Sequence, residues 1–410
     1  MSHIINSADR TTDIFIKKQI KDFQALDFGG LRQNLIDPKP TVYGLVTVIA
    51  VYCCDQSRWY KSERLVEPIK MALNFIERQQ RGGGCFDYPS CNFLSAPDTS
   101  FILKQMFPMY HLLVKYLPET SFVKEKSQLL RIISLSLEGV MNGGFHTPNH
   151  RWAIAAALMQ GSNIFEDRAT EMIEVANRYL SEGIDGNDDG EYAERSTGNY
   201  NAVVNSALIT LYEETGDDLY LGYVQRNLAM MLHYFDPDHT IFTENSTRQD
   251  KGSKEYGYKY FYQYLYMSDY KYSPDFDGAA HKLMADNMNR SDEAPFCLHK
   301  LMLNERLMSY TFERFGYPET FEKYFKASGV LRRRNGDFSY SILENKKKYL
   351  ILKKGDMQLS IKIGISYCDL RNFVVQKLER TPQGYRLSFR GEGWYYKPFE
   401  EKPSTNDWWE

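Results

Sequence analysis

Five side chains that could serve a binding site lie within seven residues, in the turn NGGFHTP and directly after it. They are His146, Asn149, His150, Arg151 and Trp152. Pro148 is well placed to begin a helix, so Asn149 and His150 are expected in its first turn, where the helix dipole adds a partial positive charge. Such a position suits an anion, for example a sugar carboxylate. The alternative is structural: Asn149 caps the turn and His150 packs against Trp152.

A second loop contains tyrosines that could move a proton. It reads DDGEYAERSTGNYN over residues 188–201, and its candidates are Tyr192, Glu194, Arg195 and Tyr200. A tyrosine acting as acid or base needs its pKa of about 10 lowered, as a nearby arginine or protonated histidine does. Alternatively, the acidic run is a solvated loop and Tyr200 a core aromatic. Because the acidic residues lack EF-hand spacing, no metal site is predicted.

A third loop offers a cationic clamp and two histidines. Arg248 could hold a carboxylate with two parallel hydrogen bonds, and His233 or His239 could act as a base or neutralise charge. A surface loop with an Arg–Asp pair explains the same residues equally well. Tyr88, in the earlier loop GGGCFDYP, is a further candidate for contact with a sugar ring.

These loops recur between helical segments. Each contains Gly or Asp, an aromatic residue and a polar turn, and the aromatic markers lie 47 to 59 residues apart at Phe28, Phe86, Phe145, Tyr192 and Phe242. Two antiparallel helices of ordinary length fill one interval. Such hairpins either stack as an open solenoid or close into an α/α toroid. The unequal units and long loops favour a toroid, with residues 1–330 forming an incomplete toroid of five or six hairpins.

The pattern changes to period two after Gly329. The stretch 332–336 is expected to be a polar turn, and alternating runs at 338–343, 349–352, 357–363, 373–378 and 385–389 predict antiparallel strands. Residues 331–410 therefore form a small antiparallel β domain. It is short for a sandwich, which suggests a truncated version of a longer domain.

Composition excludes several classes of protein. Lys and Arg total 50 against 53 for Asp and Glu, so no basic excess indicates a nucleic-acid or membrane partner. The apolar run 43–54 is shorter than the ~20 residues that cross a bilayer. The first residues lack the pattern of a signal peptide and the six cysteines form no CxxC pair, so a cytoplasmic protein with free thiols is expected, or a secreted or periplasmic one if the N-terminus was trimmed. No nucleotide, zinc-protease or serine-hydrolase motif occurs, and no cofactor is predicted.

A toroid followed by a β domain, with Asn149-His150 on one loop and a tyrosine on the next, resembles the heparinase II/III-like polysaccharide lyases and the related alginate lyases. The resemblance implies β-elimination at a uronic acid of a polysaccharide or oligosaccharide. It implies that Asn149 and His150 neutralise the carboxylate and that Tyr200, or else Tyr192, is the acid–base group. The family usually has a further His in the β domain. This chain has none after His299, so either His233 or His239 would have to replace it, or the His belonged to a missing C-terminal part.

Two alternatives remain at this stage. An α/α-toroid glycoside hydrolase acting on uronides needs two carboxylates flanking the bond, and Glu191 or Glu194 with Asp87 or Glu244 could supply them. A glycan-binding protein without activity would instead stack sugars on aromatic residues along the loops, namely Phe86, Tyr88, Phe145, Trp152 and Tyr192. Neither the glycan nor the oligomeric state follows from the sequence.

Overall fold

A computed structural model describes residues 1–290, 293–395 and 397–407. The chain forms two compact units. The first contains Met1–Phe235 and His239–Pro318, and the second contains Asp236–Asp238 and Glu319–Glu410. The second unit thus begins before the expected boundary at residue 330, because the chain is already in a strand at Thr320–Phe325.

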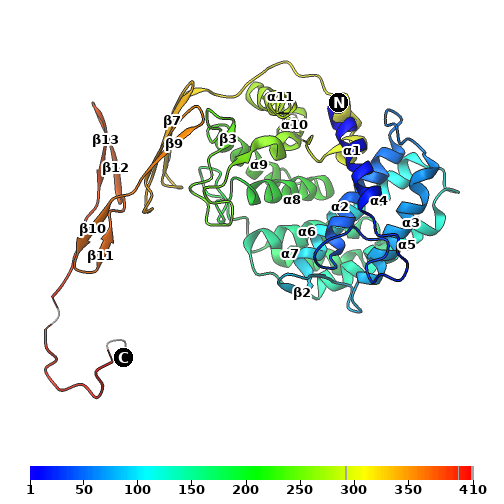
Figure 1. The fold of residues 1–410 in the computed structure, drawn as a ribbon, viewed down its shortest axis with the longest axis horizontal. Helices are drawn as coiled ribbons and strands as arrows, with labels where there is room; N and C mark the ends of the chain where they lie inside the picture. Colours follow the sequence, from blue (N-terminus) through cyan, green and yellow to red (C-terminus); the bar gives the residue numbers. More distant parts are fainter. Residues whose placement is uncertain (291–292, 396, 408–410) are drawn as a thin grey trace. The chain divides into compact units, whose positions relative to one another are not determined.

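The first unit is a series of helical hairpins (Figure 1). In the described part of the chain the long helices are α1 (Ser2–Lys18), α2 (Pro38–Cys53), α3 (Val66–Gln79), α4 (Ala96–Tyr116), α5 (Val123–Met141), α6 (Pro148–Ser162), α7 (Ala169–Leu180), α8 (Tyr200–Thr215), α9 (Asp218–Met231), α10 (Phe261–Tyr270) and α11 (Pro274–Asn289). Each even-numbered helix packs against the odd-numbered helix that follows it. The helices α2, α4, α6, α8 and α10 also contact one another in succession, so they form an inner layer.

Burial explains which helices are inner. Twelve residues of α2 are buried, including the run from Leu45 to Cys53, whereas the outer helix α7 buries only Met172, Val175 and Ala176. A helix that is apolar all round must be covered on all sides, while an amphipathic one covers a core with a single face. The expected hairpin pattern is therefore confirmed.

Two short helices connect the ends of this series. The helix α12 (Leu298–Leu303) packs against α1, α2 and α4, and α13 (Glu305–Met308) packs against α10. The last hairpin is thereby connected to the first ones. This arrangement is a closed ring of hairpins rather than an open solenoid.

The inner helices begin at the loops identified in the sequence. Pro38 and Pro148 occupy the first turns of α2 and α6, and the side chain of Ser95 accepts a hydrogen bond from the backbone of Asp98 to cap α4. Two short hairpins precede inner helices: β1 (Phe86–Tyr88) pairs with β2 (Asn92–Ser95) before α4, and β3 (Thr240–Ile241) pairs with β4 (Glu255–Tyr256) before α10. The loops thus place side chains from distant parts of the sequence at the starts of neighbouring inner helices.

The second unit is built on an antiparallel meander. Its five strands are hydrogen-bonded in sequence order: β5 (Thr320–Phe325), β6 (Val330–Asn335), β7 (Phe338–Leu343), β8 (Leu350–Lys354) and β9 (Met357–Ile361). Two further hairpins follow, β10 (Gly364–Tyr367) with β11 (Leu370–Asn372) and β12 (Lys377–Thr381) with β13 (Gly384–Ser388). The antiparallel β domain is confirmed, although most of the expected strand at 373–378 is irregular.

The arginine-rich stretch 332–336, expected to be a turn, lies mostly inside β6. Arg332 and Arg334 point to the buried side and Arg333 is exposed, the alternation of a strand. Nη2 of Arg332 lies 2.7 Å from Oδ1 of Asp236, and Nζ of Lys353 lies 3.0 Å from Oδ2 of the same carboxylate. These ion pairs allow charged side chains inside the unit, which local sequence patterns do not reveal.

None of the helices in the described residues has the length and apolar character needed to span a membrane.

Candidate active site

Asn149 at the start of α6 is held by a carboxylate from the next loop. Its Nδ2 lies 2.7 Å from Oε2 of Glu194, and both side chains are buried. Oδ1 of Asn149 has no hydrogen-bond partner among the described residues. Burial raises the pKa of Glu194, against the opposing effect of the hydrogen bond from Asn149 and the charge of Arg248. An amide and a carboxyl group from two loops are therefore fixed side by side.

Arg248 connects this pair to Tyr200. Its Nε lies 3.4 Å from Oε1 of Glu194, and its guanidinium carbon lies 5.1 Å from the centre of the Tyr200 ring. The hydroxyl of Tyr200 is 3.5 Å from Oε1 of Gln249. Three loops predicted to carry chemistry thus meet here, with an arginine over the ring of the tyrosine.

Asp250 holds the second and third loops together, a role not anticipated from the sequence. Its Oδ1 accepts hydrogen bonds from Ser196 at 2.9 Å and Ser246 at 2.6 Å, and its Oδ2 accepts one from the backbone of Gly198 at 2.9 Å. The hydroxyl oxygen of Ser196 also accepts a hydrogen bond from the backbone N–H of Tyr200. The first residue of α8 is therefore positioned by a buried carboxylate.

His150 occupies the other side of Asn149. Its ring lies 4.6 Å from that of His146 and 5.9 Å from Phe101, and 8% of the residue is exposed. Burial, with the charge of His146 adding to it, lowers the pKa of His150 to about 4. The imidazole is consequently neutral at physiological pH. It can exchange hydrogen bonds with a carboxylate but does not supply a positive charge.

A lysine that the sequence did not single out supplies charge near Tyr88. Nζ of Lys39, in the first turn of α2, is 3.1 Å from Oδ1 of Asp98 and lies over the rings of Tyr88 and Phe101 at 5.5 and 5.2 Å. Since Phe101 also contacts His150, Tyr88 belongs to the same neighbourhood. No motif marked Lys39, because its contacts lie on β1 and α4, far away in the chain.

Three predicted site residues do not join this cluster. Arg195, at a backbone φ of 52°, pairs with Glu191 at 3.6 Å. Nδ1 of His233, just beyond the end of α9, is 3.1 Å from the carbonyl oxygen of Ala229 in that helix. His239 lies 3.2 Å from the carboxylate of Asp286 on α11. These three residues lie close in sequence to the loops of the cluster, but their side chains point to other partners.

Trp152 and Tyr192 were expected to contact substrate, and the structure contradicts this. They are 0% and 2% exposed, so their rings cannot stack on a sugar. The hydroxyl of Tyr192 donates to Asn205 at 2.7 Å, and burial raises its pKa well above the usual value. Gly190 explains the burial: at a φ of 93°, a Cβ there would lie 2.3 Å from the carbonyl oxygen of Arg226, so the loop presses directly against α9.

Arg151 points to a different partner. Its Nη1 lies 2.9 Å from Oε2 of Glu182, and its guanidinium lies 5.7 Å from the ring of Phe145 and 5.0 Å from that of Trp152. It therefore bridges α6 to the end of the α6–α7 hairpin rather than facing Asn149 and Glu194. The predicted site residues that the structure does bring together are called the loop cluster below. They are Tyr88, His146, Asn149, His150, Glu194, Tyr200 and Arg248.

No family model and no curated protein matches the sequence. Solved structures do match. A xanthan lyase from Paenibacillus superposes with a TM-score of 0.58 at 12% identity, covering 85% of this chain and 35% of its own. Heparinase III gives 0.55 at 12% identity, with 87% and 58% covered. The chondroitin AC lyase of Streptomyces coelicolor A3 gives 0.54 at 12% identity, with 84% and 50% covered.

The chain has the fold of the polysaccharide lyases. This confirms the α/α toroid followed by a β domain, and it confirms the resemblance at the level of fold. The chain spans between 35% and 58% of the lengths of these three lyases. In this polysaccharide-lyase fold the loop cluster lies where the inner helices α6 and α8 begin.

Proposed function

We propose that this chain is a lyase that cleaves a uronic-acid-containing polysaccharide or oligosaccharide by β-elimination. The observation that carries the proposal is the contact between Arg248 and Tyr200, with Glu194 and Asn149 directly behind them. A cation over the ring of a tyrosine supplies the two kinds of group that this reaction needs, one for the substrate carboxylate and one for the proton. The fold, shared with a xanthan lyase and a chondroitin AC lyase, supports the same reaction class.

The difficult step is removal of the proton at C5 of the uronate. Charge develops on the adjacent carboxylate as the proton leaves, so groups that stabilise this charge accelerate the step. We assign that role to Arg248 and to the neutral ring of His150. Asn149, whose amide N–H groups donate to Glu194 and Thr147, orients Glu194 beside Arg248. Arg248 carries the full positive charge, because the lowered pKa of His150 keeps its imidazole neutral.

Tyr200 is the proposed acid–base group. The C5 proton passes to the unprotonated imidazole of His150, or to Tyr200 where that side chain starts as the phenolate and so gains the proton that it later donates. The electrons of the C–H bond form the C4–C5 double bond. The C4–O bond breaks, and the Tyr200 hydroxyl protonates the departing glycosidic oxygen. Oriented proton transfer of this kind contributes ~10²–10⁴-fold to a rate.

The two alternatives are less well supported. Glu191 and Glu194, the carboxylates proposed for a hydrolase, are both buried and are engaged with Asn245 and Asn149 at 2.6 and 2.7 Å. For a non-catalytic sugar-binding surface, the buried rings of Phe86, Trp152 and Tyr192 leave too few aromatic faces. The lyase proposal uses the groups that do face one another.

The test is incubation of the full chain with a panel of uronic-acid polysaccharides, including xanthan, heparan sulfate, chondroitin and alginate. A lyase produces a conjugated double bond that absorbs in the ultraviolet, together with a new reducing end. A hydrolase produces the reducing end without the absorbance. Reducing ends that form without absorbance across the panel refute β-elimination, and binding without either product indicates a sugar-binding protein.

A further inference from the structure

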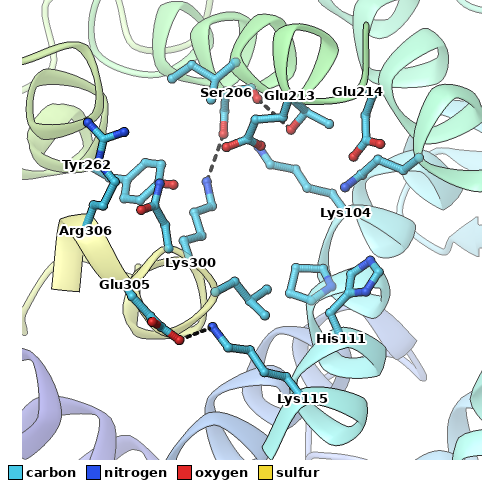
Figure 2. Close-up of a pocket in the computed structure, with 16 residues that line it drawn as sticks. Lys104, His111, Lys115, Ser206, Glu213, Glu214, Tyr262, Lys300, Glu305 and Arg306 are labelled. Carbon is cyan, nitrogen blue, oxygen red and sulfur yellow. Dashed lines mark hydrogen bonds and ion pairs between the residues drawn. The ribbon is translucent and has the colours of Figure 1, made fainter. Parts of the chain in front are cut away.

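A cavity of about 510 Å³ lies among the inner helices, away from the loop cluster. It is lined by α4, α6, α8 and α10, together with α12 and α13 (Figure 2). Tyr200 begins α8 and Glu213, which lines the cavity, lies near its end, so at 1.5 Å per residue the two are ~20 Å apart along the helix. The volume falls within the range of ~300–1,000 Å³ typical of small-molecule sites.

Four basic side chains line this cavity, and two of them are already paired. Lys115 lies 2.9 Å from the carboxylate of Glu305, and Arg306 lies 3.0 Å from that of Asp269. Lys104, in contrast, has no ion-pair or hydrogen-bond partner in the part of the chain that the structure describes. One ammonium group therefore faces the cavity without a partner.

Lys300 is the fourth Lys or Arg side chain in the lining, and among the described residues the hydrogen bond of its Nζ goes to a neutral group. Its Nζ lies 3.0 Å from the hydroxyl of Ser206 and 4.8 Å from the centre of the Tyr262 ring. Figure 2 shows Lys104 and Lys300 extending into the cavity from α4 and α12, with Glu213 on α8 across from them. Two ammonium groups thus converge on one space from separate helices.

Burial affects the protonation of the charged groups that line the cavity. Surrounding protein lowers the pKa of Lys104 and Lys300, and the charge of Lys300 lowers that of Lys104 further. The neighbouring Glu213 does not balance them fully, because burial raises its pKa to about 7 and leaves it partly protonated near neutrality. Glu214 is occupied by Asn163, and its pKa is raised by burial as well.

We propose that this cavity binds a small anion that carries a carboxylate or phosphate group beside hydroxyls, held by Lys104 and Lys300. An ammonium group is a point charge that binds either anion. The hydroxyls of Ser206 and Thr210, the amide of Gln160 and the carboxyl of Glu213 offer partners for the hydroxyls of the ligand. An acidic monosaccharide and a phosphate compound share this chemistry, and the test separates them.

The experiment is isothermal titration calorimetry on the full chain with inorganic phosphate, glucuronate and neutral glucose at constant ionic strength. We compare the wild type with Lys104→Met and with the matched control Lys115→Met, whose ammonium is paired to Glu305. Removing an unpaired ammonium from protein surroundings is not expected to harm folding, and Lys104→Gln provides a second variant. Thermal melts of each variant verify that it is folded.

We expect phosphate or glucuronate to bind the wild type and Lys115→Met, with affinity reduced at least tenfold in Lys104→Met. Binding of phosphate indicates that the ligand is a phosphate compound, and binding of glucuronate indicates that it is an acidic monosaccharide. Binding is expected to take up protons, because an anion stabilises the charged forms of both lysines, and titrations in buffers of different ionisation enthalpy measure this uptake. The proposal is overturned if neither anion binds, if only glucose binds, or if Lys104→Met and Lys104→Gln retain the affinity. The titrations measure binding and not catalysis, so their outcome does not depend on whether the lyase proposal holds.

Discussion

The guanidinium of Arg248 lies over the ring of Tyr200, 5.1 Å from its centre, although the two residues come from different loops. Arg248 also reaches Glu194 at 3.4 Å. The contact joins a cation able to bind a carboxylate to the ring of a tyrosine whose hydroxyl could move a proton. Each half of it can be tested separately.

Replacing Tyr200 by Phe removes the proposed acid–base hydroxyl and keeps the ring. We expect the rate of unsaturated-product formation to fall ~10²–10⁴-fold, because the leaving oxygen loses its proton donor. The measurement is ultraviolet absorbance on the substrate that the panel identifies. Unchanged turnover in the folded variant would refute the role of Tyr200.

Tyr192→Phe is the matched control, because it removes the hydroxyl of the other candidate tyrosine. Its hydroxyl bonds to the buried Asn205, so we expect the free energy of unfolding to drop by ~1–3 kcal/mol as the Asn205 oxygen is left without its donor. Turnover per folded molecule should stay close to that of the wild type. A large loss of turnover without loss of stability would reverse the assignment of the two tyrosines.

Arg248→Gln tests the charge at the substrate carboxylate. We expect kcat/KM to fall ~10²–10³-fold, the usual cost of losing one group that stabilises developing charge. Arg195→Gln is the comparison, since Arg195 pairs with Glu191 outside the loop cluster, and its effect on kcat/KM should be much smaller. Equal losses in the two variants would show that Arg248 has no special role.

The lowered pKa of His150 predicts a defined pH dependence of stability. Between pH 6.5 and about 4 the unfolded chain protonates this histidine and the folded chain does not. The unfolded state then binds more protons, so this contribution destabilises the fold as the pH falls through that window, by up to ~3 kcal/mol. We expect denaturant melts from pH 7 to pH 4 to show a smaller loss for His150→Gln than for the wild type. Parallel curves for the two proteins contradict this prediction.

In the second unit, Asp236→Asn removes the carboxylate charge that Arg332 and Lys353 share, so we expect this unit to be less stable. Removing one partner from a buried ion pair costs ~3–5 kcal/mol. Hydrogen exchange followed by mass spectrometry should therefore show faster exchange in the strands β6 to β8. Glu322→Gln is the control, because the Arg380 side chain that it pairs with is largely exposed and such pairs contribute little. Equal exchange in Asp236→Asn and the wild type would mean that the ion pairs do not support the sheet.

The sequence alone determined the repeating architecture and the loops that matter. Helical periodicity and the recurring loops are local properties, so they predicted the hairpins, and the period-two runs predicted the β domain. Pro148 similarly indicated the start of the helix that presents Asn149 and His150. Each of these inferences depends on residues close together in the chain.

Only the tertiary structure decided which loop residues face one another. Tyr200 and Tyr192 are eight positions apart in one loop, yet one lies beneath Arg248 and the other is buried against Asn205. The candidate arginines and histidines show the same difference: Arg248 and His150 belong to the loop cluster, whereas Arg195 and His233 do not. The direction of a side chain depends on packing between helices that are distant in sequence. Lys39 and the cavity around Lys104 and Lys300 were invisible for that reason: their neighbours are brought together only when the ring of hairpins closes.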